Sequence, residues 1–429
     1  LVSGKDARID TSRITNQRGL IAARSDLAIT GQSLNNDSSG LVQSGSDLTL
    51  AVEHIDNRNS GDAGGIVSQG NLSLKTTDLQ NDAGVILTEK QATLDATRFS
   101  NIAGTLFALD TLALATHSDS DNRQGIIQGS GIVLDTHGYQ LDNREGTIYS
   151  LAAMQLATAG LNNQNGALGA KGDFSLLATS LDNRSGGRLV SEQAMALTLD
   201  RLDNQDGQIQ SLGELVVNAV SGAIDNTRGL IRSGATVTLN AASLLNRNTQ
   251  AEEKGIEGLD VTIHSQQLEN AQGTVLAGKT LSITNVGTLD NTQGELSAAG
   301  KLSLSGAAMR LLNTDGVVIG GERVNIDASD VTGDGQLLSL GDMALRTRQA
   351  FNNTGDIIAN GSVTFTTPGR VTNAGNLLAG TTLDLTATSL FNAASGEIAA
   401  GATWLSVAGS LDNYGLIDGS QTWLRAGTL

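Results

Sequence analysis

A short sequence unit recurs from one end of the chain to the other. Its clearest copies are Leu141–Gly146, Leu181–Gly186, Leu202–Gly207 and Leu289–Gly294, which read Leu-Asp-Asn-x-x-Gly. The Asn of each copy, termed the marker Asn, stands at positions 16, 36, 57, 81, 101, 122, 143, 163, 183, 204, 226, 246, 270, 291, 313, 353, 373, 392 and 413. With a degenerate copy around 331–333, twenty copies follow one another about 21 residues apart. A tandem repeat of this period restricts the chain to a repeat architecture.

The pattern inside each copy favours short strands. In Asp47–Ala51 and Lys301–Ser305, apolar and polar residues alternate for a few positions before Gly, Asn or Asp ends the run. A helical solenoid needs apolar residues at i, i+3 and i+4, and a leucine-rich repeat has a different Leu spacing. The sequence therefore predicts an all-β parallel β-helix with one coil per copy and Leu, Ile, Val and Ala inside.

The marker Asn is the expected corner residue. We expect it to adopt the left-handed conformation, which Asn and Gly tolerate, and to stack its amide on the amides of neighbouring coils. The residues expected to form this structural corner ladder include Asn143, Asn163, Asn183, Asn204, Asn226 and Asn291.

Composition narrows the function. The chain has 27 Lys and Arg against 44 Asp and Glu, a net charge of −17, which disfavours nucleic-acid binding. Aromatic residues make up 3 %, too few for several ordinary globular cores. No apolar run is long enough for a membrane-spanning helix, and no signal peptide is found. With no Cys, disulfides and thiolate chemistry are excluded, and no cofactor or metal is expected.

The Leu-x-Asn-x-x-Gly corner, followed by Gly-x-Leu-x-Leu-x-Ala strands, resembles the haemagglutinin repeat of bacterial two-partner-secretion exoproteins. This family includes filamentous haemagglutinin and the contact-dependent growth inhibition exoproteins, and the resemblance covers residues 9–429. It implies a right-handed β-helical filament that an outer-membrane partner pore exports to the surface of a Gram-negative cell. We expect residues 1–429 to form a single continuous β-solenoid of about 20 coils, an internal segment of a larger exoprotein whose N-terminal secretion domain binds the pore.

Two insertions interrupt the period. The marker intervals 57–81 and 246–270 are each 24 residues, and the extra residues fall near 58–65 and 247–258. Insertions on one side of a solenoid often carry binding, although loop length can also drift without a function. The second insertion is charged, so its candidate partner-binding residues are Arg247, Glu252, Glu253, Lys254 and Glu257.

Trp404 and Trp423 share a Thr-Trp-Leu context 19 residues apart. If Leu405 and Val407 point inward, Trp404 points outward by strand alternation. With Tyr414, the two Trp residues are candidates for an aromatic platform that binds a sugar ring or a protein. Burial under whatever follows Leu429 is the alternative.

Two other groups of polar residues have both a functional and a plain interpretation. His117 and His137, on adjacent coils near Asp119, Asp121 and Asp135, could form a metal or pH-sensitive patch or a solvated surface pair. A row of Asp residues could form a carboxylate pair or a cation site, or could be corner chemistry balanced by Arg144, Arg184 and Arg228; it contains Asp142, Asp182, Asp203 and Asp225.

These observations predict a non-enzymatic extracellular shaft that presents or forms a cell-contact surface for adhesion or receptor binding. The expected partners are the outer-membrane pore and a receptor on a host or neighbouring bacterial cell, without nucleic acid and without membrane insertion. One alternative is the receptor-binding region of a contact-dependent growth inhibition toxin carrier. A more remote one is a carbohydrate-active β-helix enzyme.

Overall fold

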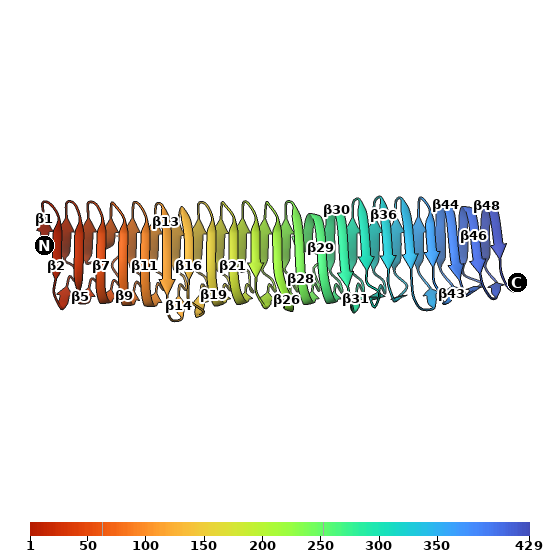
Figure 1. The fold of residues 1–429 in the computed structure, drawn as a ribbon, viewed down its shortest axis with the longest axis horizontal. Helices are drawn as coiled ribbons and strands as arrows, with labels where there is room; N and C mark the ends of the chain where they lie inside the picture. Colours follow the sequence, from red (N-terminus) through yellow and green to blue (C-terminus); the bar gives the residue numbers. More distant parts are fainter. Residues whose placement is uncertain (62, 252) are drawn as a thin grey trace. The chain divides into compact units, whose positions relative to one another are not determined.

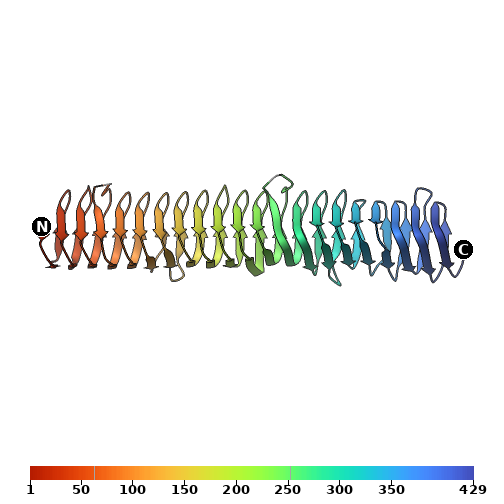
Figure 2. The same cartoon turned by 90° about the horizontal axis from the view of Figure 1, so that it is seen from above.

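The chain folds into stacked coils of β-strands. The computed structural model describes residues 1–61, 63–251 and 253–429, which contain 48 strands and no helix. Neighbouring coils pair in parallel (Figures 1 and 2), and the coils form a β-solenoid of about 21 turns, about 20 residues apart. The predicted fold class is therefore confirmed. The chain divides into two compact units, Leu1–Asn218 (unit 1) and Ala219–Leu429 (unit 2).

Each coil contains three strand segments. In one coil they are β12 (Thr105–Ala108), β13 (Thr111–Thr116) and β14 (Ser120–Asp121). The first segment follows the corner at a marker Asn, the second comes after another turn, and the third leads to the next marker Asn. Each segment of this coil pairs in parallel with the same segment of a neighbouring coil, so the strands fall into three parallel ladders.

In unit 1 the first ladder consists of β1 (Val2–Ser3), β4 (Leu20–Ala23), β6 (Leu41–Ser44), β8 (Gly65–Ser68), β10 (Val85–Thr88), β12, β15 (Ile126–Gly129), β18 (Thr147–Ser150), β20 (Ala167–Ala170), β22 (Arg188–Ser191) and β25 (Gln208–Ser211). The second and third ladders contain β2 (Ala7–Asp10), β3 (Arg13–Thr15), β5 (Leu27–Asn35), β7 (Leu48–Asp56), β9 (Leu72–Gln80), β11 (Ala92–Ser100), β13, β14, β16 (Gly131–Asp135), β17 (Gln140–Asp142), β19 (Met154–Asn162), β21 (Phe174–Asp182), β23 (Met195–Thr198) and β24 (Arg201–Asp203). Several of these strands cover both segments because the second turn is only a bend. The chain passes into unit 2 within β26 (Leu215–Asp225).

In unit 2 the first segments lie in β27 (Leu230–Ser233), β29 (Gly255–Glu269), β30 (Thr274–Asn285), β32 (Glu295–Ala298), β35 (Val317–Gly320), β38 (Gln336–Ser339), β41 (Asp356–Ala359), β44 (Asn376–Ala387), β46 (Glu397–Val407) and β48 (Leu416–Arg425). The remaining second segments are in β28 (Thr236–Leu245), β33 (Lys301–Ser305), β36 (Arg323–Asp327), β39 (Asp342–Arg346) and β42 (Val363–Thr366). The remaining third segments are β31 (Thr288–Asp290), β34 (Arg310–Leu312), β37 (Asp330–Thr332), β40 (Phe351–Asn353), β43 (Arg370–Asn373), β45 (Ser389–Asn392) and β47 (Leu411–Asn413).

The interior is a column of aliphatic side chains. In β7, Leu48, Leu50 and Val52 are buried while Thr49 and Ala51 are exposed, because successive strand residues point to opposite sides. Equivalent residues stack in register from coil to coil, as in the row Leu27, Leu48, Leu72, Ala92 and Leu112. Burial of each Leu contributes about 2 kcal/mol, so the coils need few aromatic residues.

The corner geometry corrects one expectation. No marker Asn has a positive φ; in the corners up to Asn313 the left-handed residue stands two positions later, as Gln124 does after Asn122 and Glu145 does after Asn143. The reason is burial. The Asn side chain points into the solenoid and is fully buried in Asn122 and Asn143, so an exposed residue must make the turn.

Candidate partner-binding surfaces

The marker Asn residues form a continuous hydrogen-bond ladder within a run of coils. Asn143 Nδ2 donates to Asn163 Oδ1 at 2.8 Å and to the Gly146 carbonyl at 3.2 Å, while its Oδ1 accepts from Asn122 Nδ2 at 2.7 Å. The same forward donation joins Asn163 to Asn183 and Asn183 to Asn204 in unit 1. In unit 2, Asn226 donates to Asn246, and Asn291 donates to Asn313. All six residues expected in the ladder are buried, and each forms an amide hydrogen bond with a marker Asn of a neighbouring coil.

The two insertions share one construction. Ser60 and Thr249 stand three residues after a marker Asn, where the corner Gly stands in most other coils. Each hydroxyl accepts the backbone N–H that begins the next coil, from Val85 at 2.9 Å and from Thr274 at 3.0 Å. The inserted chain can leave the stack (Figure 2) because this hydroxyl supplies the acceptor that a corner Gly carbonyl supplies elsewhere. After the two insertions the strands resume at Gly65 and Gly255.

The charged insertion is held against its own unit. Arg247 forms an ion pair with Glu269, and Gln250 Nε2 donates to the Gln293 carbonyl two coils further on at 2.5 Å. Glu257 belongs to β29 and accepts from Arg232 at 2.6 Å.

Of the other two expected binding residues that the structure describes here, Glu253 is exposed and has a positive φ, and Lys254 is half-buried. Glu252 lies outside the described residues. Among the described candidate residues of this loop, Glu253 is exposed, whereas Arg247 and Glu257 are engaged in ion pairs.

The two Trp residues stack on each other. Trp404 and Trp423 pair in register on β46 and β48, with ring centroids 3.9 Å apart and planes inclined by 13°. Both indoles are about two-fifths exposed, whereas Leu405 is buried, so the predicted outward orientation of Trp404 is confirmed. A groove of about 370 Å³ beside them is also lined by Asp384, Ser406 and Arg425.

Tyr414 does not join this pair. Its ring lies 5.6 Å from Phe391, at the marker Asn corner, and Arg370 lies over the Phe391 ring at 5.3 Å. Among the described residues no ring contact connects Tyr414 with either Trp. The three-residue aromatic platform expected from the sequence is therefore wrong, because Tyr414 stands on a different segment of the coil.

His117 and His137 lie on adjacent coils with ring centroids 4.2 Å apart. His117 Nε2 is 3.1 Å from Asp95 Oδ1, and His137 Nδ1 is 3.1 Å from the Thr116 carbonyl oxygen. Asp135 accepts the backbone N–H of His137, and Asp119 accepts that of Gln140. Over the described parts of the chain, no three His, Asp or Glu side chains could jointly hold a metal ion.

The Asp row belongs to the corners. Asp182 and Asp203 pair in register, and Asn162 separates Asp182 from Asp142. Arg184 Nε and Nη2 donate to Asp182 at 2.9 and 2.7 Å, and Arg144 holds Asp142 in the same way.

These contacts shift the pKa values of the carboxyl groups. Burial opposes ionisation of Asp182 and Asp142, but the hydrogen bonds from Arg184, Gln164 and Arg144 prevail and lower both pKa values. The hydrogen bond from Arg58 likewise lowers the pKa of Asp56. In unit 2, Asp225 accepts from the Thr227 hydroxyl at 2.6 Å, and Arg228 has a positive φ. All four carboxylates are thus engaged in hydrogen bonds at the corners, as expected of corner chemistry.

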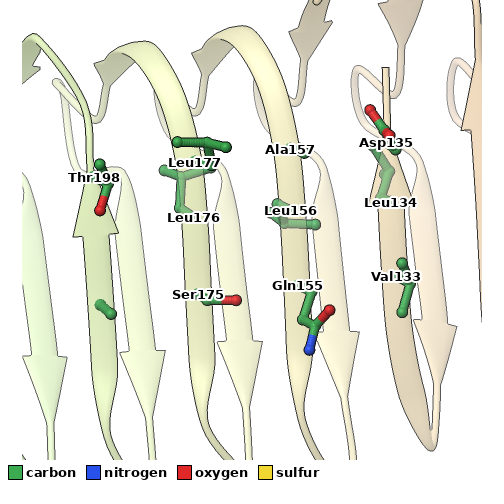
Figure 3. Close-up of a pocket in the computed structure, with 11 residues that line it drawn as sticks. Val133, Leu134, Asp135, Gln155, Leu156, Ala157, Ser175, Leu176, Leu177 and Thr198 are labelled. Carbon is green, nitrogen blue, oxygen red and sulfur yellow. The ribbon is translucent and has the colours of Figure 1, made fainter. Parts of the chain in front are cut away.

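A groove on the outer side of β16, β19, β21 and β23 was not predicted from the sequence. It measures about 410 Å³ and is lined by Val133, Gln155, Ala157, Ser175, Leu177 and Thr198. Figure 3 shows these side chains on neighbouring strands. Leu177 is 61 % exposed beside small neighbours. An apolar residue at an outward position of the alternation is the signal that could have located it.

The hydroxyls of Ser60 and Thr249 were also missed. Their signal is the replacement of the corner Gly three residues after the marker Asn.

Within the described ranges, no helix is long and apolar enough to cross a membrane.

Comparison with known proteins gives a consistent set of matches. The model of the haemagglutinin repeat matches residues 1–75, 55–139, 137–228, 217–267, 257–322, 317–367 and 358–415. No solved structure matches the chain.

Similar curated proteins include a deoxyribonuclease CdiA of Dickeya dadantii, 31 % identical over 61 % of this chain and 7 % of the relative. A toxin CdiA of Escherichia coli is 24 % identical over 59 % of this chain and 9 % of the relative. A tRNA nuclease CdiA of Yersinia mollaretii is 28 % identical over 47 % of this chain and 6 % of the relative. The chain thus matches less than a tenth of the length of each.

Proposed function

Because the chain belongs to the haemagglutinin-repeat family, we propose that it is a section of the extracellular shaft of a two-partner-secretion exoprotein. The observation that carries this proposal is the coil-by-coil repetition of a buried aliphatic row and a buried Asn ladder. Such a stack gives each coil nearly the same neighbours, which suits a spacer. Its partners would be an outer-membrane pore, during export, and a receptor on the cell that is contacted. Its location would be the surface of a Gram-negative cell.

We propose that this section is not catalytic. The nuclease names of the relatives describe proteins of which this chain matches less than a tenth. The best candidate carboxylates for catalysis, Asp142 and Asp182, are each held by an Arg two residues later. Purified chain should therefore leave DNA, tRNA and acidic polysaccharides intact, and turnover of any of them would contradict this part of the proposal.

A deletion in register tests the shaft. Removing residues 144–163 deletes one complete marker interval and joins Asn143 to Gln164, which is a regular continuation. Removing residues 144–153 deletes half a coil and takes the later coils out of register with the earlier ones. In the exoprotein, the first variant should be displayed on whole cells at the normal level and keep cell-contact activity, and the second should not be displayed. A displayed first variant that has lost contact activity would show that these coils are a specific binding site instead.

The exposed end of the charged insertion supports a second candidate, in which this section itself binds a receptor. Glu253 is exposed, while Arg247 and Gln250 fix the loop to later coils. Replacing residues 247–254 by Thr-Gln-Gly, the corner sequence of 292–294, would remove the loop and keep the coil.

The other insertion provides a matched control, since replacing residues 58–64 by the same three residues removes an equivalent loop. Binding of labelled exoprotein to target cells should fall at least about tenfold for the first variant only, which corresponds to about 1.4 kcal/mol. Equal binding of both variants would contradict a role of the charged loop.

A further inference from the structure

The third ladder of unit 2 is interrupted at one place. β31, β34 and β37 pair in succession, and β40, β43, β45 and β47 form a separate four-stranded sheet. Within the described residues, β37 and β40 belong to adjacent coils but do not pair. One side of the solenoid therefore lacks its backbone cross-links between these two coils.

The Asn ladder is interrupted at the same boundary. Leu312 pairs with Thr332, so Gly333 occupies the next position, where a marker Asn would stand. Asn313 Nδ2 donates only to carbonyl oxygens, those of Gly316 and Gln336, both at 3.2 Å. A new ladder begins at Asn353, which donates to Asn373 at 2.7 Å.

The other two sides remain connected across this boundary. β35, β38 and β41 pair in register in the first ladder, and β36, β39 and β42 do so in the second. The interior also continues, since Val331 and Phe351 are buried and Phe351 packs edge-on against Phe365 at 5.0 Å. The two coils are thus joined on two sides and by their core, but not on the third side.

Arg348 lies at one edge of the open side. Its Nη1 donates to Asp327 Oδ1 at 2.7 Å and to the Ala328 carbonyl at 2.9 Å, in the coil before. Its backbone N–H donates to the Ser329 carbonyl at 3.0 Å. Gln349 Nε2 also donates to Ser329 Oγ at 3.3 Å, and the bonds of Arg348 and Gln349 precede the unpaired strand β40.

We propose that residues 331–335 and 351–353 form a joint in the shaft, where unit 2 opens on its third side before any other coil boundary of that unit. Hydrogen bonds of the ladder each contribute on the order of 1 kcal/mol, and local opening follows the bonds that must be broken. The joint lets the shaft yield under bending or tension while the aliphatic column stays closed. This conformational role goes beyond that of a uniform spacer.

Hydrogen exchange of the full chain, followed by mass spectrometry, tests the joint. Peptides that cover 331–335 and 351–353 should exchange at least about tenfold faster than the equivalent peptides around 289–294 and 371–375. Equal protection of both sets would overturn the proposal.

A repaired corner is the decisive variant. Gly333→Asn alone is unsuitable, because φ is +109° and a Cβ there would lie 2.5 Å from the Asn313 carbonyl carbon. Replacing Thr332–Gly335 by Asp-Asn-Thr-Gln-Gly, the sequence of 290–294, restores the full corner and both missing amide bonds. Exchange at 351–353 should then slow at least about fivefold, and unchanged exchange in a folded variant would overturn the proposal.

Arg348→Ala provides a second variant that keeps the corner unchanged. It should speed exchange at the joint about threefold or more, as expected for loss of a bond to a charged group. Arg346→Ala, which removes an exposed Arg from the same coil, should not. Equal exchange in these two variants would show that Arg348 has no role at the joint. If residues 351–353 were also as protected as residues 371–375, the joint itself would be overturned.

Discussion

The two units use the same coil but differ in the continuity of their polar ladders. In unit 1, nine hydrogen bonds of 2.6–2.8 Å connect the marker residues from Asn16 to Asn204, and third segments pair without a break from β3 to β24. In unit 2, one run ends at Asn313 and another begins at Asn353. The buried aliphatic row shows no such gap, since Leu311, Val331, Phe351 and Val371 are all buried.

This difference separates two contributions to stability. Burial of apolar side chains is set within every coil and tolerates Leu, Val or Phe at one position. The ladder needs one residue type in each coil, because a single replacement leaves both neighbouring amides without their partner. Continuity of the core therefore does not guarantee continuity of the cross-links.

The largest expected effect comes from the interior of the unbroken ladder. Asn143→Ala removes the acceptor of Asn122 Nδ2 and the donor to Asn163 Oδ1, both buried, so we expect a loss of about 2–4 kcal/mol in the free energy of unfolding. Asn353→Ala in unit 2 should cost roughly half as much, because Asn353 accepts from no marker Asn. Urea unfolding measures both, and equal losses would contradict the comparison.

An intermediate effect should be the same in both units. Ser60→Ala and Thr249→Val each remove the hydroxyl that accepts a half-buried N–H of the next coil, so each should cost about 1–2 kcal/mol. Ser175→Ala, at an outward position, is the control and should stay within about 0.5 kcal/mol of the original chain. If only one insertion were sensitive, the two loops would not share the construction described above.

The smallest expected effect is on the stability of the fold at acid pH. The pKa values of Asp56, Asp142 and Asp182 are lowered in the folded state. Their stabilisation is therefore complete above the unfolded value of about 3.9 and is lost as the pH falls through the lower folded values. Asp182→Asn should flatten the decline in the free energy of unfolding, measured with urea, between about pH 4 and pH 2 by a few tenths of a kcal/mol.

Asp290→Asn is the matched change in unit 2, where the carboxylate accepts from the Thr292 hydroxyl at 2.6 Å instead of from an Arg. Asp290→Asn should flatten the decline of the free energy of unfolding with falling pH less than Asp182→Asn does. An equal response of the two variants would show that the Arg partners of unit 1 make no difference to its acid sensitivity.

The sequence was sufficient to predict the features that repeat from coil to coil. The alternation around Leu48 and Leu50 set the inward rows, and the same alternation placed Trp404 outside. The intervals between successive marker Asn residues located both insertions, because an added residue shifts the position of every later marker Asn. The degenerate copy near Val331 was also visible in the sequence.

The remainder depends on contacts that no period specifies. The left-handed position two residues after the marker Asn accepts Gln124, Glu145 and Ala103 alike, so its residue type carries no signal. Tyr414 was grouped with the Trp residues by proximity in sequence, but its corner faces Phe391. Arg247 and Glu257 were candidates because of their charge, and their ion pairs became apparent only in three dimensions.

The one-way donation along the amides gives the stack a polarity. Each Asn Nδ2 points toward the coil that comes later in the chain, as from Asn122 to Asn143 and from Asn143 to Asn163. When a new turn closes, it thus offers an unfilled N–H to residues that are only then arriving, and each turn acts as a template for its successor. A polypeptide that emerges with its N-terminal part first would find this growing surface ready at every step.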